Sequence, residues 1–144
     1  MGTDMQTYIE VYSKNDGKWY YVAKGYAHRW YEMFGRIGGV RAMMGNEAYH
    51  ERGIPENACW EIKMKHFSAE NSYHSMTYYT FDEFKKTVLD YEIKWGEDDE
   101  DEEPKRITMD NVMGCDIPCW SLMIKKLVKK YGAENIRLTF IFDS

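Results

Sequence analysis

Two arginines at opposite ends of one glycine-containing segment are the first candidates for binding chemistry. Arg41 follows a glycine-rich aromatic stretch, and Arg52 stands next to Gly53. Two guanidinium groups presented from the ends of one loop can each form forked hydrogen bonds with phosphate or carboxylate oxygens. The same arginines can instead hold the loop itself by binding carbonyl groups and nearby glutamates. Both interpretations of Arg41, Arg52 and Gly53 remain open at this point.

The residues just before this segment add donors and aromatic rings. His28 and Arg29 can supply hydrogen bonds, and Trp30 or Tyr31 can stack on a base. Stacking contributes about 1–3 kcal/mol per base. They continue a dense aromatic series that starts at Trp19, Tyr20 and Tyr21, and such a series also suits a protein core or an interface.

His74 is followed by Ser75, a pairing that places a base beside a hydroxyl nucleophile. No third residue to orient the histidine is evident, and no G-x-S-x-G turn is present. We therefore expect His74 to form hydrogen bonds at a strand end or to contact a ligand, and we do not expect an enzyme. The cysteines and histidines lack short chelating spacings, so neither a metal site nor a cofactor is predicted.

The charge of the chain is unevenly distributed. The net charge is −5, but the run Glu97 to Glu103 carries −7, which leaves 19 basic and 17 acidic residues elsewhere. Because like charges repel, residues 96–104 are predicted to form a solvated loop. Such a run repels phosphate, so long nucleic acids are not expected partners. With no apolar run of about 18 residues and no secretory leader, we expect a cytoplasmic protein without a membrane partner.

The ends of the chain show the two-residue alternation of strands. Gln6 to Tyr12 and Lys18 to Ala23 flank the turn signal Asn15-Asp16-Gly17, which predicts a hairpin. Ile136 to Phe142 predicts a C-terminal strand, and Tyr73 to Tyr79 is a shorter strand candidate.

The middle of the chain shows helical spacing. A first helix is predicted from His28 to about Met43, with a break or a close approach near Gly38. A second is predicted over 56–67, with Pro55 at its first position and Trp60, Met64 and Phe67 as its buried stripe.

Two further helices are predicted. The capping box Thr80 to Glu83 opens one that extends to about residue 94, with Phe81, Phe84, Val88 and Trp95 on its buried side. Asp116 and Pro118 open the last one, with Gly132 as its cap and a buried stripe of Trp120, Met123, Leu127 and Tyr131. Helices between antiparallel strands predict a single α+β domain: the N-terminal hairpin and the C-terminal strand in one sheet, packed with about four helices.

Several short motifs in a fixed order resemble those of a widespread family of small bacteriophage and prophage proteins. They are Val40-Arg41, Arg52-Gly53-Ile54-Pro55, His74-Ser75, Thr80 to Phe84, and Ile136-Arg137 to Asp143. The chain departs from the family pattern by having Ile54 in place of leucine and by its acidic run. The resemblance implies a phage accessory gene that acts against host defence, and it implies no catalytic residues.

These observations lead to one expected function and two alternatives. The expected function is a non-enzymatic, homo-oligomeric counter-defence protein that sequesters a small anionic, nucleotide-type host immune signal. Arg41 and Arg52 would bind its phosphates, and Trp30 or Tyr31 would stack on its base. The first alternative is an inhibitor of a host defence protein that uses the acidic run, and the second is a nucleotide hydrolase that uses His74.

Overall fold

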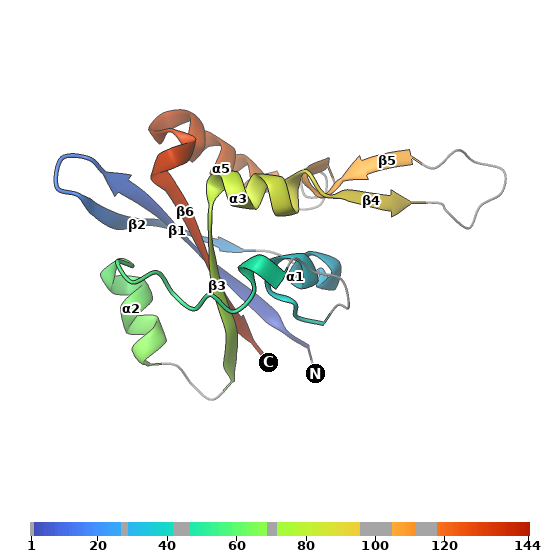
Figure 1. Ribbon diagram of the computed structural model, residues 1–144, viewed down its shortest axis with the longest axis horizontal. Coiled ribbons are helices and arrows are strands. Elements are labelled where there is room, and N and C mark those ends of the chain that lie inside the picture. The colour runs from blue at the N-terminus through green and yellow to red at the C-terminus, as the bar shows by residue number, and fades with distance from the viewer. Residues whose placement is uncertain (1, 27–28, 42–46, 69–71, 96–104, 112–117) are drawn as a thin grey trace.

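The computed structural model describes residues 2–26, 29–41, 47–68, 72–95, 105–111 and 118–144. It confirms the α+β class, with an antiparallel sheet of four strands in the order β2-β1-β6-β3. These strands are β1 (Asp4–Ser13), β2 (Lys18–Tyr26), β3 (Tyr73–Thr80) and β6 (Ile136–Asp143). The predicted hairpin and C-terminal strand are therefore correct, and Figure 1 shows β6 crossing the molecule between β1 and β3.

The hairpin turns where the sequence predicts it. Gly17 has a φ of +66°, and its N–H donates to the Ser13 carbonyl at 2.8 Å. A left-handed residue is strained for any side chain larger than hydrogen, so the glycine sets the turn. The acidic run, which follows β4, lies outside the described residues.

One face of the sheet carries the larger core. Alternate residues of β1 and β6 are buried there against the helices α1, α3 and α5, among them Ile9, Val11, Leu138, Phe140 and Phe142. Phe142 meets Phe34 edge to face, with ring centroids 5.6 Å apart. This face shows the alternation expected of a half-buried strand.

The other face is covered as well, which the alternation does not predict. Tyr8 and Ile141 pack there against Ala58 and Cys59, which precede helix α2 (Trp60–Phe67), and against Ile62 within that helix. Glu10 and Arg137 lie on this same face and are also buried. The sheet is thus enclosed by helices on one side and by a single connecting segment on the other.

Helix α1 (Tyr31–Gly38) is shorter than the predicted span from His28 to Met43. It ends because Gly39 adopts a left-handed conformation with φ +71°, and the Gly39 N–H caps the Gly35 carbonyl at 2.9 Å. A β-carbon on Gly38 would lie 2.5 Å from the Phe142 ring, so the glycine allows the helix to approach the sheet. The expected break near Gly38 is confirmed; His28 and Met43 lie outside the described residues.

Helix α2 (Trp60–Phe67) corrects the second helix prediction. Pro55 is not part of it, because the Cys59 N–H donates to the Glu10 carboxylate at 2.8 Å and holds the preceding residues against the sheet. The helix consequently turns Ile62 inward. Trp60, Met64 and Phe67, the predicted buried stripe, are exposed instead.

The helix opened by the capping box is also shorter than predicted. Thr80 and Glu83 form the reciprocal box as expected, but α3 (Phe81–Phe84) passes into a π-helical turn at Lys85–Leu89. The chain then forms β4 (Glu92–Trp95), which pairs with β5 (Lys105–Thr108) in a hairpin that extends away from the main sheet (Figure 1). This second sheet is not predicted from the sequence.

Helix α5 (Pro118–Tyr131) begins at the predicted proline and is followed by Gly132, whose φ is +90°. Met123 and Leu127 of the predicted stripe pack, partly buried, against the main core beside the buried Ile124, whereas Tyr131 is exposed. The predicted stripe is therefore confirmed at Met123 and Leu127 and wrong at Tyr131; Asp116 and the side chain of Trp120 lie outside the described residues. None of the helices that the structure describes is long and apolar enough to cross a membrane.

Candidate functional site

Arg52 and Gly53 run along the outer edge of β3 and complete its hydrogen bonding. The Arg52 guanidinium donates to the Tyr78 carbonyl at 2.8 Å and to both carboxylate oxygens of Glu83 at 3.0 and 3.3 Å. The Gly53 N–H donates to the Met76 carbonyl at 2.8 Å. Burial raises the pKa of Glu83, but the hydrogen bonds from Arg52 and Thr80 and the charge of Arg52 together outweigh burial and hold that pKa below its usual value. Arg52 therefore has a structural role whether or not it also binds a ligand.

Arg41 belongs to a different network, built where the first and last described residues meet. Its Nε donates to Thr3 Oγ1 at 3.0 Å, and Thr3 Oγ1 contacts Ser144 Oγ at 2.9 Å. Ser144 Oγ in turn lies 2.7 Å from His74 Nε2. Tyr31 joins the group, because its hydroxyl accepts from the Thr3 N–H and its ring lies under the Arg41 guanidinium. The fold thus connects three predicted residues, Arg41, Tyr31 and His74, whereas the guanidinium of Arg52 binds Tyr78 and Glu83.

Both ring nitrogens of His74 form hydrogen bonds with serine hydroxyls. Its Nδ1 lies 3.0 Å from Ser75 Oγ, opposite the contact to Ser144, and its ring stacks on Phe142. Ser75 has a φ of +54°, at an irregularity in the pairing of β3 with β6. A histidine 3.0 Å from a serine hydroxyl can act as a base, so this pair is the described feature that a hydrolase would use.

The remaining predicted residues are dispersed. Arg29 forms an exposed ion pair with Asp4 at 2.8 Å, and this hydrogen bond lowers the pKa of the Asp4 carboxyl. Trp30 immediately precedes α1 and packs, partly buried, against the main core. His28 lies outside the described residues.

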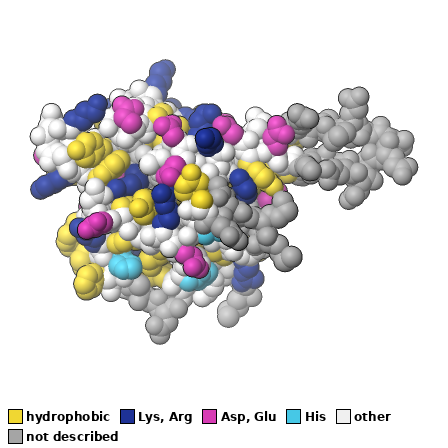
Figure 2. All heavy atoms as spheres, in the orientation of Figure 1, with side chains coloured by type: hydrophobic (Ala, Val, Ile, Leu, Met, Phe, Trp, Pro, Cys, Tyr) yellow, Lys and Arg dark blue, Asp and Glu magenta, His cyan; other side chains and the backbone are white. Residues whose placement is uncertain are grey.

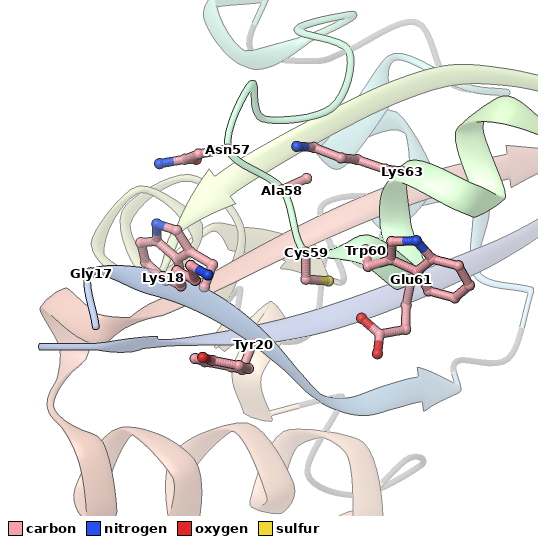
Figure 3. A pocket seen from close by; sticks show the side chains of 10 residues that line it. Gly17, Lys18, Tyr20, Asn57, Ala58, Cys59, Trp60, Glu61 and Lys63 are labelled. Atoms are coloured by element: carbon pink, nitrogen blue, oxygen red, sulfur yellow. The ribbon is translucent and has the colours of Figure 1, made fainter. Parts of the chain in front are cut away.

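A hollow of about 480 Å³ opens between the start of β2 and the start of α2, away from all of these residues. Figure 3 shows its walls: the strand residues around Lys18 on one side, and the segment from Asn57 into α2 on the other. Its volume falls within the range of about 300–1,000 Å³ that is typical of small-molecule sites. Its lining includes Lys18, Trp19, Asn57, Trp60 and Lys63.

A buried ion pair fixes one wall of this hollow. Arg137 donates to Glu10 at 2.8 and 3.1 Å, and its remaining nitrogen donates to Asn57 Oδ1 at 2.7 Å. The same guanidinium stacks on the Trp19 ring, 4.1 Å from its centroid. Because Arg137 can only donate, the Asn57 oxygen must face it, and the amide N–H groups of Asn57 are left for another acceptor.

The hollow carries a positive balance of charge. Lys18 and Lys63 contribute two positive charges and Glu61 one negative charge, which gives +1. Within the described chain neither lysine forms an ion pair. The indole N–H groups of Trp19 and Trp60 are donors only, as are the lysines. This composition favours an anionic ligand with a flat ring.

Cys59 lines the hollow but is not a reactive nucleophile. Burial raises the pKa of its thiol to about 12, and the thiolate is the nucleophilic form. The chemistry that the hollow supports is therefore binding by hydrogen bonds, charge and stacking.

Little of this hollow follows from the sequence. Trp19 belongs to the aromatic series that can stack on a base, but the spacing of Trp60 predicts a buried stripe, and no pattern marks Asn57. The available signal was Arg137, a charged residue within an apolar strand pattern, which needs a buried partner. That partner, Glu10, lies far away in the sequence.

No protein-family model, curated protein or solved structure matches the chain. Among the residues described, no group of three or more histidine, cysteine, aspartate or glutamate side chains is arranged to hold a metal ion.

Proposed function

We propose that the protein binds a small anionic, nucleotide-type ligand in the hollow between β2 and α2 and releases it unchanged. The observation that carries this proposal is that two unpaired lysines and two tryptophans line one hollow. Lysine binds phosphate as a point charge, and an exposed indole offers a face for a base.

In this proposal each wall of the hollow binds a different part of the ligand. Lys18 belongs to β2 and Lys63 to α2, on different walls of the hollow (Figure 3), and in this proposal both ammonium groups attract the phosphate. Asn57 adds an amide donor whose orientation Arg137 holds. Trp60 at the rim provides the stacking surface. A preorganised donor costs less conformational entropy on binding than a mobile one.

The biological setting belongs to the same proposal and rests on the motif resemblance. We propose a phage-encoded accessory protein that sequesters a nucleotide-type signal of host immunity. A sequestering protein needs affinity and no turnover, and a hollow whose thiol is protonated at neutral pH is suited to that role.

Calorimetric titration with adenosine, ribose 5-phosphate, AMP and a cyclic dinucleotide tests the proposal. AMP should bind more tightly than either adenosine, which lacks the phosphate, or ribose 5-phosphate, which lacks the base. Lys18→Gln and Lys63→Gln should each weaken AMP binding about fivefold, equivalent to about 1 kcal/mol. Lys129→Gln, an equally exposed change on α5, is the matched control and should bind like the wild type.

Two outcomes would move or remove the site. If both lysine variants bind AMP as tightly as the wild type and Arg41→Ala binds it more weakly, the ligand lies in the network of Arg41 and His74 instead. Absence of binding to every compound would refute the ligand class. Chromatography of the ligand after denaturing the protein distinguishes sequestration, which returns intact nucleotide, from hydrolysis.

A further inference from the structure

Helix α2 presents an apolar stripe to solvent. Trp60, Met64 and Phe67 are 70%, 45% and 87% exposed, while Ile62 on the opposite side of the helix is fully buried. The three exposed residues follow at the spacing i, i+4, i+7, which aligns them on one side. Figure 2 shows hydrophobic side chains at the surface over α2. Contiguous apolar surface with a polar rim marks an interaction site.

The two flanks of the stripe carry opposite charges. At 3.6 residues per turn, Glu61 lies on one side of the line from Trp60 to Phe67, and Lys63 lies on the other. If two copies of α2 pack side by side in the same direction around a two-fold axis, the acidic flank of each copy faces the basic flank of the other. The stripe is therefore complementary to itself, as an isologous interface requires.

We infer that this stripe is the contact between two copies of the chain, paired through parallel α2 helices with Glu61 of each copy opposite Lys63 of the other. A second copy supplies both the apolar face and the complementary charges without any further partner. The same pairing of flanks fixes orientation in coiled coils. The inference concerns the protein without ligand. Because Trp60 and Lys63 also line the hollow, the second copy and a bound nucleotide would compete for these two side chains.

The exposed area sets the expected strength of the dimer. An aromatic side chain buries about 150–250 Å². Covering the exposed parts of Trp60, Met64 and Phe67 therefore removes on the order of 400 Å² of surface per copy from water. A standard interface buries about 800 Å² per partner. We therefore expect a dissociation constant between about 1 µM and 1 mM, that of a weak dimer that exchanges with monomer.

Sedimentation equilibrium of the full chain without ligand, across that concentration range, tests the interface. The wild type should dimerise, and Phe67→Glu should remain monomeric. Leu122→Glu is the matched control, because Leu122 is also an exposed apolar residue but lies on α5. Melting curves should show that Phe67→Glu keeps its fold, since its side chain is almost fully exposed.

Charge exchange tests the orientation. Glu61→Lys places like charges against the basic flank, and Lys63→Glu does the same against the acidic flank, so each should weaken the dimer at least about tenfold. The double variant Glu61→Lys with Lys63→Glu should restore it. A wild type that stays monomeric at about 1 mM would overturn the inference, as would loss of the dimer in Leu122→Glu but not in Phe67→Glu. Failure of the double variant to recover would overturn the parallel pairing.

Discussion

Glu10 and Arg137 stand directly opposite each other on β1 and β6, and their side chains form a buried ion pair with a separation of 2.8 Å. The pair does more than join two strands. Glu10 accepts a hydrogen bond from the Cys59 N–H, and Arg137 donates one to Asn57 Oδ1. The pair therefore holds residues 57–59, which precede α2, against the sheet. The position of the hollow depends on these two residues.

Breaking this pair should destabilise the protein strongly. Glu10→Gln leaves the Arg137 charge buried without a counter-charge, and Arg137→Met does the reverse to Glu10. Removing one partner of a buried pair costs about 3–5 kcal/mol, which urea unfolding would measure. The double variant should lose less than the sum of the two single losses.

The exposed pair of Arg29 and Asp4 provides the control for this prediction. Arg29→Met should change the free energy of unfolding by no more than about 1 kcal/mol, because surface pairs contribute little. Additive effects of the Glu10 and Arg137 substitutions would contradict the interpretation of the pair as one unit.

The bond between Arg52 and Glu83 should make stability fall in acid. The native pKa of Glu83 lies below its ordinary value of 4.5, so its contribution is complete above pH 4.5 and is lost as pH falls through the lowered native pKa. The difference in free energy of unfolding between wild type and Glu83→Gln should therefore shrink below pH 4.5. Chemical denaturation at several pH values measures it, and a difference that grows in acid would show the opposite linkage.

Gly38 should tolerate no side chain. A β-carbon there would approach the Phe142 ring to 2.5 Å, and overpacking of this kind costs about 1–3 kcal/mol. Thermal unfolding of Gly38→Ala should show a lowered melting temperature. In a chain that also carries Phe142→Leu, the Gly38→Ala substitution should lower the melting temperature less than it does in the wild type. Equal losses in both backgrounds would mean that the ring is not the obstacle.

The sequence by itself determined the local features of the fold. Asn15-Asp16-Gly17 predicts its turn because Gly17 needs a left-handed backbone, and Thr80 with Glu83 predicts a helix start because both capping bonds are local. The alternation of Ile136 to Phe142 likewise predicts a strand. Each of these depends on residues that are neighbours in the chain.

Tertiary contacts decided which side of α2 is buried. The spacing of Trp60, Met64 and Phe67 predicts the correct stripe on α2 but the wrong side to bury. Periodicity shows that a helix has two faces and does not show which face meets the sheet. Here the Cys59 N–H, bound to Glu10, sets the rotation of α2.

The hollow was decided by tertiary structure alone. Lys18 and Lys63 both line it because the tertiary structure brings the start of α2 close to the start of β2. The anchor is the pair of Glu10 and Arg137, which are 127 positions apart in the chain. Burial of a charge requires a partner, so the sequence indicates that Arg137 has one, but only the pairing of β1 with β6 identifies it.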